Sequence, residues 1–272
     1  MCKDCGCGLP GATPVGISSH SHPHEHGHGH THEHGHDHDH EHGDAESRRT
    51  LEVGRAILEK NDRLAERNRG FFRGRGLLTL NVLSSPGAGK TTLLRQTIQK
   101  LGTRLKAGVI VGDLATDNDA RRLRETAAPV VQITTGTICH LEAEMVGRAI
   151  QELNLEGIGL LIIENVGNLV CPASYDLGED LRVVLLSVTD GEDKPLKYPP
   201  MFQSANVVII SKIDLAEPCD FDRAAALANI HRLAPDAVVF DLSAKTGKGM
   251  DAWCDFLVQQ HQVVKNRNPL SS

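Results

Sequence analysis

The chain has 272 residues and a formal net charge of −6, which favours one domain of about two hundred residues with an extension. The negative charge argues against broad nucleic-acid binding, and with 3% aromatic residues no base-stacking platform is apparent. No apolar run reaches the ~18 residues of a membrane span, and the first residues lack the apolar core of a signal peptide. The seven cysteines therefore predict a reducing, cytoplasmic setting and metal or redox chemistry, with the isolated Cys219 and Cys254 as buried structural thiols.

The first 45 residues form a segment of their own. Large apolar side chains are almost absent from it and Gly, His, Asp and Glu are abundant, so it cannot build a core. We expect a disordered metal-binding tail over residues 1–45 and a folded domain over residues 46–272. Cys2, Cys5 and Cys7 are close enough for their thiolates to converge on one soft or borderline cation. The alternative is a disordered end with chance cysteines.

A histidine tract follows, in which every even-numbered residue from 20 to 42 is a histidine. These residues are His20, His22, His24, His26, His28, His30, His32, His34, His36, His38, His40 and His42. Neutral imidazole suits Ni²⁺, Zn²⁺ and copper, and the interleaved carboxylates add charge. So many equivalent ligands predict several ions in fluctuating geometry, which is buffering or storage. A purification tag is the artefact alternative, although tags are usually contiguous histidine runs.

A surface helix is expected over residues 46–69, and a phosphate-binding motif comes after it. An apolar strand at 77–83 runs into a glycine-containing turn, and a Lys-Thr pair opens a helix at 91–105. Lys90 would reach the terminal phosphates and the Thr91 hydroxyl would hold Mg²⁺, at the positive end of the helix. The residues expected to contact nucleotide are Ser85, Pro86, Gly87, Ala88, Gly89, Lys90, Thr91 and Thr92. An ordinary strand–turn–helix is the alternative.

Apolar strands then alternate with helical patterns. The expected strands are 77–83, 108–111, 130–133, 158–163, 183–188, 207–210 and 237–241, and the expected helices are 91–105, 120–126, 141–153, 223–233 and 250–264. Strands that are apolar throughout, separated by helices, predict an α/β fold with a mainly parallel sheet covered on both faces. Ligands collect at the carboxyl ends of the strands in such sheets.

Carboxylates follow two of these strands. Asp113 and Asp119, after the second strand, are candidates to hold Mg²⁺ or a catalytic water, and Asp119 is alternatively placed to cap a helix. Glu164 and Gly167, after the fourth, have the spacing of a γ-phosphate sensor: the glycine N–H can touch the phosphate, and the carboxylate can hold Mg²⁺ or its water. Alone, each signal is weak.

Base recognition is predicted after the last two strands. The Asp214 carboxylate can accept hydrogen bonds from N1–H and the exocyclic amine of guanine, whereas adenine would leave it unpaired. The Lys212 stem can cover the base, and Ser243, Ala244 and Lys245 would add a backbone N–H to the guanine oxygen. In this order and at these strand ends, the motifs together predict a GTP-binding domain.

Residues 47–265 resemble the HypB family, the hydrogenase nickel-incorporation GTPases of the SIMIBI class of P-loop proteins. The resemblance rests on residues 84–92, 112–120, 164–169, 191–199, 211–214 and 243–245. The cysteine cluster and histidine tract resemble family extensions. The resemblance implies a GTP-dependent homodimer that hydrolyses GTP and helps deliver Ni²⁺ to the [NiFe]-hydrogenase large-subunit precursor, with a companion nickel-maturation protein. No obvious glutamine or arginine finger is present, so slow intrinsic hydrolysis is expected.

A second metal site in that family uses an adjacent Cys-His pair and a downstream Cys, which correspond here to Cys139, His140 and Cys171. The residues themselves support it. Cys139 and His140 follow one predicted strand, and Cys171 lies four residues beyond Gly167 on the loop after another. Both strands would end on the nucleotide side, so the three ligands can approach one another.

Two residues depart from the family pattern. Ser84 stands at the first loop glycine, and Ser211 stands at the Asn of the base-recognition motif, which implies loss of an amide that braces the loop and contacts the base. Lys197 resembles a family lysine tied to dimerisation, or is simply an exposed lysine. Leu215 matches a dimer-contact leucine, whereas Cys219 replaces the second one.

The sequence thus predicts a GTP-hydrolysing nickel metallochaperone that also stores nickel. Three alternatives stay open: a GTPase chaperone for another metalloenzyme such as urease, a nickel or zinc storage protein whose GTPase domain is secondary, and an ATP-dependent kinase-like enzyme.

Overall fold

The computed structural model describes residues 41–267. The chain divides into two units, residues 1–57 and 58–272, and helix α1 (Glu41–Gly74) begins in the first and ends in the second. The cysteine cluster and the histidine tract lie outside the described residues. The domain boundary expected near residue 45 stays a prediction.

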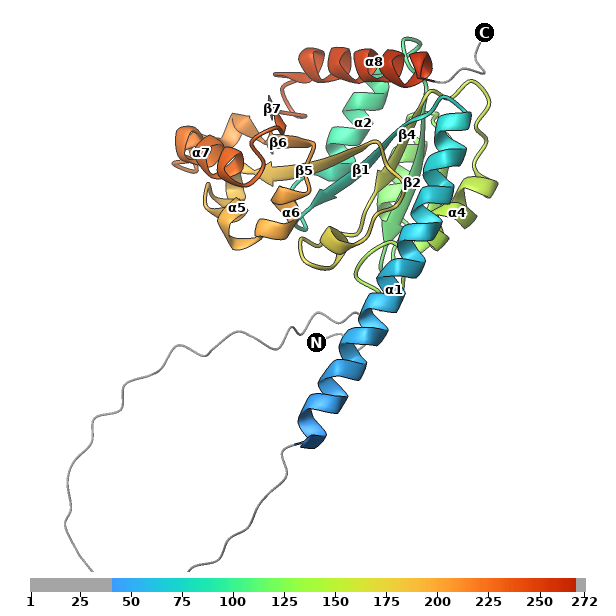
Figure 1. The fold of residues 1–272 in the computed structure, drawn as a ribbon. Helices are drawn as coiled ribbons and strands as arrows, with labels where there is room; N and C mark the ends of the chain where they lie inside the picture. The colour runs from blue at the N-terminus through green and yellow to red at the C-terminus, as the bar shows by residue number, and fades with distance from the viewer. Residues whose placement is uncertain (1–40, 268–272) are drawn as a thin grey trace, which may run out of the picture. The chain divides into compact units, whose positions relative to one another are not determined.

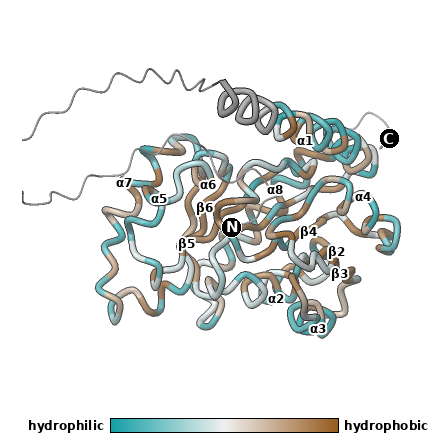
Figure 2. The backbone as a smooth tube through the Cα atoms, turned by 90° about the horizontal axis from the view of Figure 1, so that it is seen from below, coloured by the Kyte–Doolittle hydropathy of each residue, from teal (hydrophilic) through white to brown (hydrophobic). Residues whose placement is uncertain are grey.

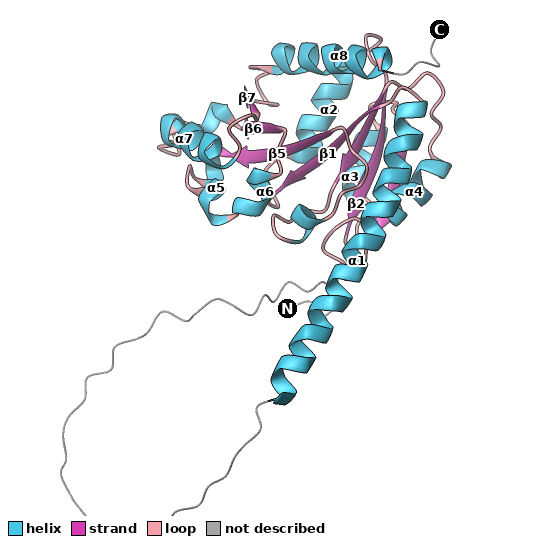
Figure 3. Cartoon of the chain, viewed as in Figure 1, coloured by secondary structure: helices cyan, strands magenta, loops and turns pink. Residues whose placement is uncertain are grey.

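A seven-stranded sheet, parallel throughout, forms the centre of the second unit (Figures 1 and 3). The strands are β1 (Leu78–Ser84), β2 (Ala107–Asp113), β3 (Val130–Thr134), β4 (Leu160–Glu164), β5 (Leu181–Ser187), β6 (Val207–Ser211) and β7 (Val238–Leu242). Their order is β3-β2-β4-β1-β5-β6-β7, so β1 lies between β4 and β5, where the order reverses. All seven predicted strands and the α/β fold class are confirmed.

Helices cover both faces of the sheet because the strand residues alternate between the two faces, which carry three apolar clusters in all. Leu80, Val82, Val109 and their neighbours on one face pack with α2 (Lys90–Leu101), α3 (Asn118–Arg124) and α8 (Met250–Asn266). On the other face, residues of α1 and α4 (Ala143–Glu152) pack on one half, and α6 (Pro199–Gln203) and α7 (Arg223–Leu233) on the other. Figure 2 shows the hydrophobic strands as brown tubes between helices of mixed hydropathy.

The helices differ from expectation in several respects, and α1 is longer at both ends than the surface helix expected over residues 46–69. Helix α2 ends at Leu101 and not at Leu105, because Gly102 takes a positive φ of 51° and its N–H closes the helix on the Ile98 carbonyl. Several one-turn elements were not predicted: η1 (Cys171–Ser174), η2 (Val188–Asp190), α5 (Lys194–Lys197), α6 and η3 (Ile213–Leu215). Over residues 41–267 no helix is long and apolar enough to cross a membrane.

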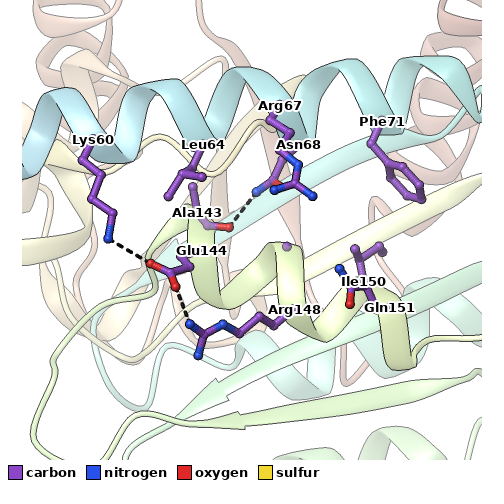
Figure 4. A pocket seen from close by; sticks show the side chains of 11 residues that line it. Lys60, Leu64, Arg67, Asn68, Phe71, Ala143, Glu144, Arg148, Ile150 and Gln151 are labelled. Atoms are coloured by element: carbon purple, nitrogen blue, oxygen red, sulfur yellow. Dashed lines mark hydrogen bonds and ion pairs between the residues drawn. The ribbon is translucent and has the colours of Figure 1, made fainter.

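The last part of α1 is attached to α4 beside a cavity of about 490 Å³ (Figure 4). The Asn68 amide donates to the Ala143 carbonyl at 2.8 Å, and Glu144 pairs with both Lys60 and Arg148. Asn61 also accepts a hydrogen bond from the Ala143 N–H at 2.9 Å. Helix α1 therefore fixes the start of α4, three residues after His140.

Candidate nucleotide and metal site

The loop between β1 and α2 has the backbone of a phosphate cradle. Gly87 and Gly89 adopt φ of 76° and 95°, a left-handed conformation that side-chain-bearing residues rarely take. Gly89 is the N-cap of α2 without a side-chain cap, so the first N–H groups of the helix remain directed toward the loop. The predicted strand, turn and helix thus occur in the expected order.

Lys90 and Thr91 both contact protein side chains. Lys90 Nζ donates to Ser84 Oγ at 2.9 Å, and Thr91 Oγ1 donates to Glu164 Oε1 at 2.7 Å. Ser84, which departs from the family glycine, therefore provides a polar partner for the lysine. Burial lowers the pKa of Lys90, opposed by the charges of Glu164, Asp119 and Asp113. The predicted phosphate ligand Lys90 and the predicted Mg²⁺ ligand Thr91 are therefore both close to Glu164.

Glu164 is the feature that best fits a cation. Only 2% of the residue is exposed, and its second carboxylate oxygen has no hydrogen-bond partner. Burial raises its pKa to about 7, although the Lys90 charge and the Thr91 hydrogen bond act in the opposite direction. A buried carboxylate oxygen without a partner, beside a threonine hydroxyl, is the donor set that Mg²⁺ prefers. Its role as a ligand stays a prediction.

The two aspartates after β2 lie differently. Asp113 Oδ1 accepts from the N–H groups of Ala115 and Thr116, both at 3.0 Å, which fixes the turn after the strand. Asp119 lies in the first turn of α3, whose N-cap is Asp117, so the N-cap alternative for Asp119 is wrong. Roles for both in holding Mg²⁺ stay predictions.

The predicted γ-phosphate sensor lies against the phosphate loop. A Cβ atom added to Gly167 would be 3.3 Å from Pro86 Cα, so a glycine permits this close approach. Ser85 Oγ also donates to Asp190 Oδ2 at 2.6 Å, which ties the loop to the segment after β5. Thr92 accepts from Arg122 at 3.1 Å.

The base-recognition residues come together as predicted. Ser243 Oγ donates to Asp214 Oδ1 at 2.6 Å, and Ala244 and Lys245 follow directly after it. Lys212 Nζ donates to the Gly87 carbonyl at 2.8 Å. The Ser211 hydroxyl donates to the Ala88 carbonyl at 3.0 Å and so braces the phosphate loop. The expectation that this position loses its bracing contact, because Ser replaces Asn, was therefore wrong.

Cys139, His140 and Cys171 form a second candidate site, called here the Cys–His site. Their ligand atoms all lie within 4.8 Å of one another, which a single metal ion can span. Cys139 and Cys171 are half-buried and His140 is buried. His140 and Cys171 are 31 positions apart in the sequence, and their proximity was predicted from the strands that they follow.

His140 has the chemistry of a ligand. Burial lowers its pKa to about 4, so the imidazole is neutral near pH 7, the form that binds metal. Its Nε2 atom has no hydrogen-bond partner, and its ring stacks on Tyr175 at a centroid distance of 3.8 Å. Its Nδ1 atom lies 4.0 Å from Cys139 Sγ, whereas Nε2 lies 3.7 Å from Glu142 Oε1. A neutral ring nitrogen beside a thiol, with a second cysteine within reach, fits a nickel or zinc ion. Elsewhere, Cys254 is buried as expected, whereas Cys219 is exposed, so that expectation was wrong.

Sequence reasoning missed the polar residues that hold these loops. Asn168 donates to the Cys139 carbonyl at 3.3 Å, and Asn165 accepts from the Leu141 N–H at 3.2 Å. One signal was available: Asn81 stands in the middle of the buried strand β1, where a buried amide requires partners. Lys197 pairs with Asp193 at 2.6 Å and is 60% exposed, and its role in dimerisation stays a prediction.

Comparison with known proteins agrees with this geometry. The family model "CobW/HypB/UreG, nucleotide-binding domain" matches residues 78–241. The hydrogenase maturation factor HypB of Azotobacter chroococcum is 52% identical over 213 residues, 78% of this chain and 70% of that protein. The hydrogenase/urease maturation factor HypB of Helicobacter pylori is 43% identical over 218 residues, 79% of this chain and 89% of that protein.

A solved structure gives the same result in three dimensions. The crystal structure of HypB from Helicobacter pylori in complex with nickel has a TM-score of 0.72 and 42% identity, covering 75% of this chain and 96% of that one. The fold, the phosphate loop and the family match define a P-loop nucleotide-binding protein of the CobW/HypB/UreG class. Within that class, the chain belongs to the HypB hydrogenase maturation factors.

Proposed function

We propose that this chain is a GTP-hydrolysing nickel metallochaperone that helps insert Ni²⁺ into the [NiFe]-hydrogenase precursor. One observation carries the proposal: the loop that begins at Glu164 and Gly167 beside the nucleotide cradle continues to Cys171 of the Cys–His site. A change at the phosphate end of this loop therefore acts directly on a metal ligand. The family relationship supports hydrogenase as the recipient.

In the proposed reaction, Lys90 and the backbone N–H groups of the loop stabilise phosphate charge as GTP is cleaved to GDP and phosphate. Mg²⁺, held by Thr91 with Glu164 or Asp113, supplies further charge neutralisation. Lys90 would leave Ser84 and the Thr91 hydroxyl would leave Glu164 when the nucleotide enters. Asp214 and Ser243 select guanine. No activating side chain is evident among these residues, so we expect slow turnover.

Dimerisation around GTP is the remaining part of the proposal. Three large apolar side chains in the segments after β2, β4 and β5 are exposed: Leu114, Val170 and Leu196, at 43%, 54% and 40%. These segments all begin at the carboxyl edge of the parallel sheet, and apolar side chains exposed there favour a protein interface. A second protomer would then bring a second set of Cys–His ligands to the same region.

Nickel binding in two nucleotide states tests the proposal. Equilibrium dialysis measures nickel bound by the full chain and by a Cys139→Ser, Cys171→Ser variant, each with GDP and with a non-hydrolysable GTP analogue. The difference between the two proteins reports the Cys–His site, because the tail contributes equally to both. We expect this difference to change with the nucleotide. Equal differences in the two states would refute the nucleotide-controlled release of metal.

Delivery to urease is a second candidate function, favoured by the name of the Helicobacter pylori relative. The two are separated by a deletion strain assayed for both enzymes with and without added nickel. A strain that keeps hydrogenase activity and loses urease activity would favour the second.

A further inference from the structure

Four buried polar residues, Asn165, Asn81, Glu179 and Arg182, form one connected network between β1, β4 and β5. Their exposures are 1%, 0%, 9% and 9%. Burying polar groups in an apolar core costs free energy unless every group is paired, so such a network requires a reason beyond packing. Among the described residues, none of the four makes a side-chain hydrogen bond to the phosphate loop or belongs to the Cys–His ligand set.

One end of the network joins the two sites. Asn165 directly follows Glu164, and its Oδ1 atom accepts from the Val166 N–H at 2.9 Å and from the Leu141 N–H at 3.2 Å. Val166 lies in the sensor loop, and Leu141 directly follows His140. A single amide oxygen is therefore shared by the loop that faces the phosphate and the loop that carries Cys139 and His140.

The network also fixes which way the Asn165 amide faces. Glu179 Oε1 is ion-paired with Arg182 at 2.9 Å, so this oxygen accepts hydrogen bonds and does not donate. Asn81 must therefore direct its NH₂ to Glu179, at 3.0 Å, and its oxygen to Asn165, whose Nδ2 donates at 3.2 Å. The Asn165 oxygen is left to face Leu141.

The other end of the network, Glu179 and Arg182, holds the segment that follows Cys171. Arg182 donates to the Ala173 and Tyr175 carbonyls, both at 2.9 Å, and Glu179 accepts from the Leu177 N–H at 2.8 Å. These residues lie in or just after η1, which begins at Cys171, and the Tyr175 ring stacks on His140. Both ligand-bearing loops are thus attached to the same four residues.

We propose that Asn165 is a positioning residue that transmits movement of the nucleotide sensor to Cys139 and His140. This is a connection separate from the continuous chain that leads to Cys171, and it rests on the nucleotide-dependent metal transfer proposed above. When Thr91 leaves Glu164 for the nucleotide, the backbone at 164–166 shifts, and the Asn165 oxygen carries the Leu141 N–H with it. Nucleotide state then sets the separation of the Cys139 and His140 ligands from Cys171.

Residue-resolved alkylation of Cys139 tests the connection in the full, metal-free chain. Iodoacetamide labelling is followed by peptide mapping, with GDP and with a non-hydrolysable GTP analogue at saturation, and nucleotide affinity and melting temperature are measured for every variant. In the unmodified chain we expect the two labelling rates to differ about fivefold or more. In Asn165→Leu, which has a similar volume but no hydrogen bonds, the ratio should fall to near one while nucleotide is still bound.

Two further variants separate this role from a structural one. Asn165→Asp keeps an acceptor for both N–H groups and should keep most of the ratio, although it loses the bond to Asn81. Thr97→Val removes a buried hydrogen-bonding hydroxyl, which accepts from Trp253 on the opposite face of the sheet, and should leave the ratio unchanged. A ratio preserved in Asn165→Leu would overturn the connection alone. Equal rates in the unmodified chain would overturn the nucleotide-linked function as well.

Discussion

We propose that a single side chain, Asp214, determines which base the nucleotide site accepts. Its Oδ1 atom already accepts a hydrogen bond from Ser243, which orients the carboxylate after β6. A carboxylate can accept from both N1–H and the exocyclic amine of guanine. Adenine offers neither donor in that arrangement, and a buried acceptor left unpaired costs binding free energy.

Asp214→Asn should weaken GTP binding by about two orders of magnitude, since one of two acceptors becomes a donor that faces the guanine amine. Xanthine nucleotides, which present an oxygen at that position, should bind better to the variant than to the unmodified chain. Competition against a fluorescent guanine nucleotide measures both. Asp222→Asn is the matched control, because Asp222 is an exposed N-cap of α7 and Asn caps equally well. Unaltered GTP affinity in Asp214→Asn would contradict the assignment.

For individual residues, the sequence predicted the position correctly where a short motif specifies the residue types that the chemistry needs. Lys90, Thr91, Asp214 and the three Cys–His residues lie where their motifs predict. Residues that depart from the family pattern were less predictable. Ser211 braces the phosphate loop through a hydrogen bond to Ala88, 123 positions away in the sequence. Such contacts depend on packing between distant strands, which a linear pattern does not contain.

At the scale of elements, the close packing of helix α1 against the loop before β5 depends on one glycine. Gly178 has a φ of 92°, and a Cβ atom there would lie 2.6 Å from the Ala65 carbonyl oxygen and 2.8 Å from the Arg69 nitrogen. Arg69 also ion-pairs with Asp176, which holds the same loop against the helix. The close approach is therefore possible only without a side chain.

Gly178→Ala should lower the free energy of unfolding by about 2–4 kcal/mol, from left-handed strain and displacement of α1. Chemical denaturation monitored by circular dichroism provides the measurement. Gly70→Ala is the control on the same helix: nothing lies within 4 Å of its added Cβ, so the change should stabilise the helix by about 0.5–1 kcal/mol. Equal effects of the two substitutions would refute the proposed close packing.

The elements themselves were largely predictable, because apolar strands and helical periodicity recur along residues 77–264. What periodicity did not reveal are the one-turn elements at 171–215. Pro172, Pro195 and Pro199 occupy first-turn positions in η1, α5 and α6, where proline is favoured, yet these elements are too short to show a repeat. One of them carries Cys171 and another carries Lys197.

At the scale of the whole molecule, bound nucleotide should stabilise the folded chain against unfolding. Its predicted contacts come from the loops after β1, β4, β6 and β7, so its binding energy adds to the stability of the sheet as a whole. GDP at about one hundred times its Kd, with Mg²⁺, should add about 2.7 kcal/mol and raise the melting temperature by roughly 5–10 °C.

Differential scanning fluorimetry gives the measurement, with ATP as the control ligand and Lys90→Ala as the control variant. ATP should leave the melting temperature of the unmodified chain unchanged, and GDP should shift that of Lys90→Ala less. A shift of the same size with ATP would favour the kinase-like alternative over a guanine-specific site.

The strand order has a consequence for how such proteins diversify. The residues predicted to choose the base follow β6 and β7, at one end of the sheet. The candidate Cys–His ligands follow β3 and β4, toward the other end, and β1 lies between the two groups. Substitutions that change the cargo therefore need not touch the residues that recognise the nucleotide. The architecture is modular in this sense: one end of the sheet can be inherited intact while the other is adapted to a different metal or recipient.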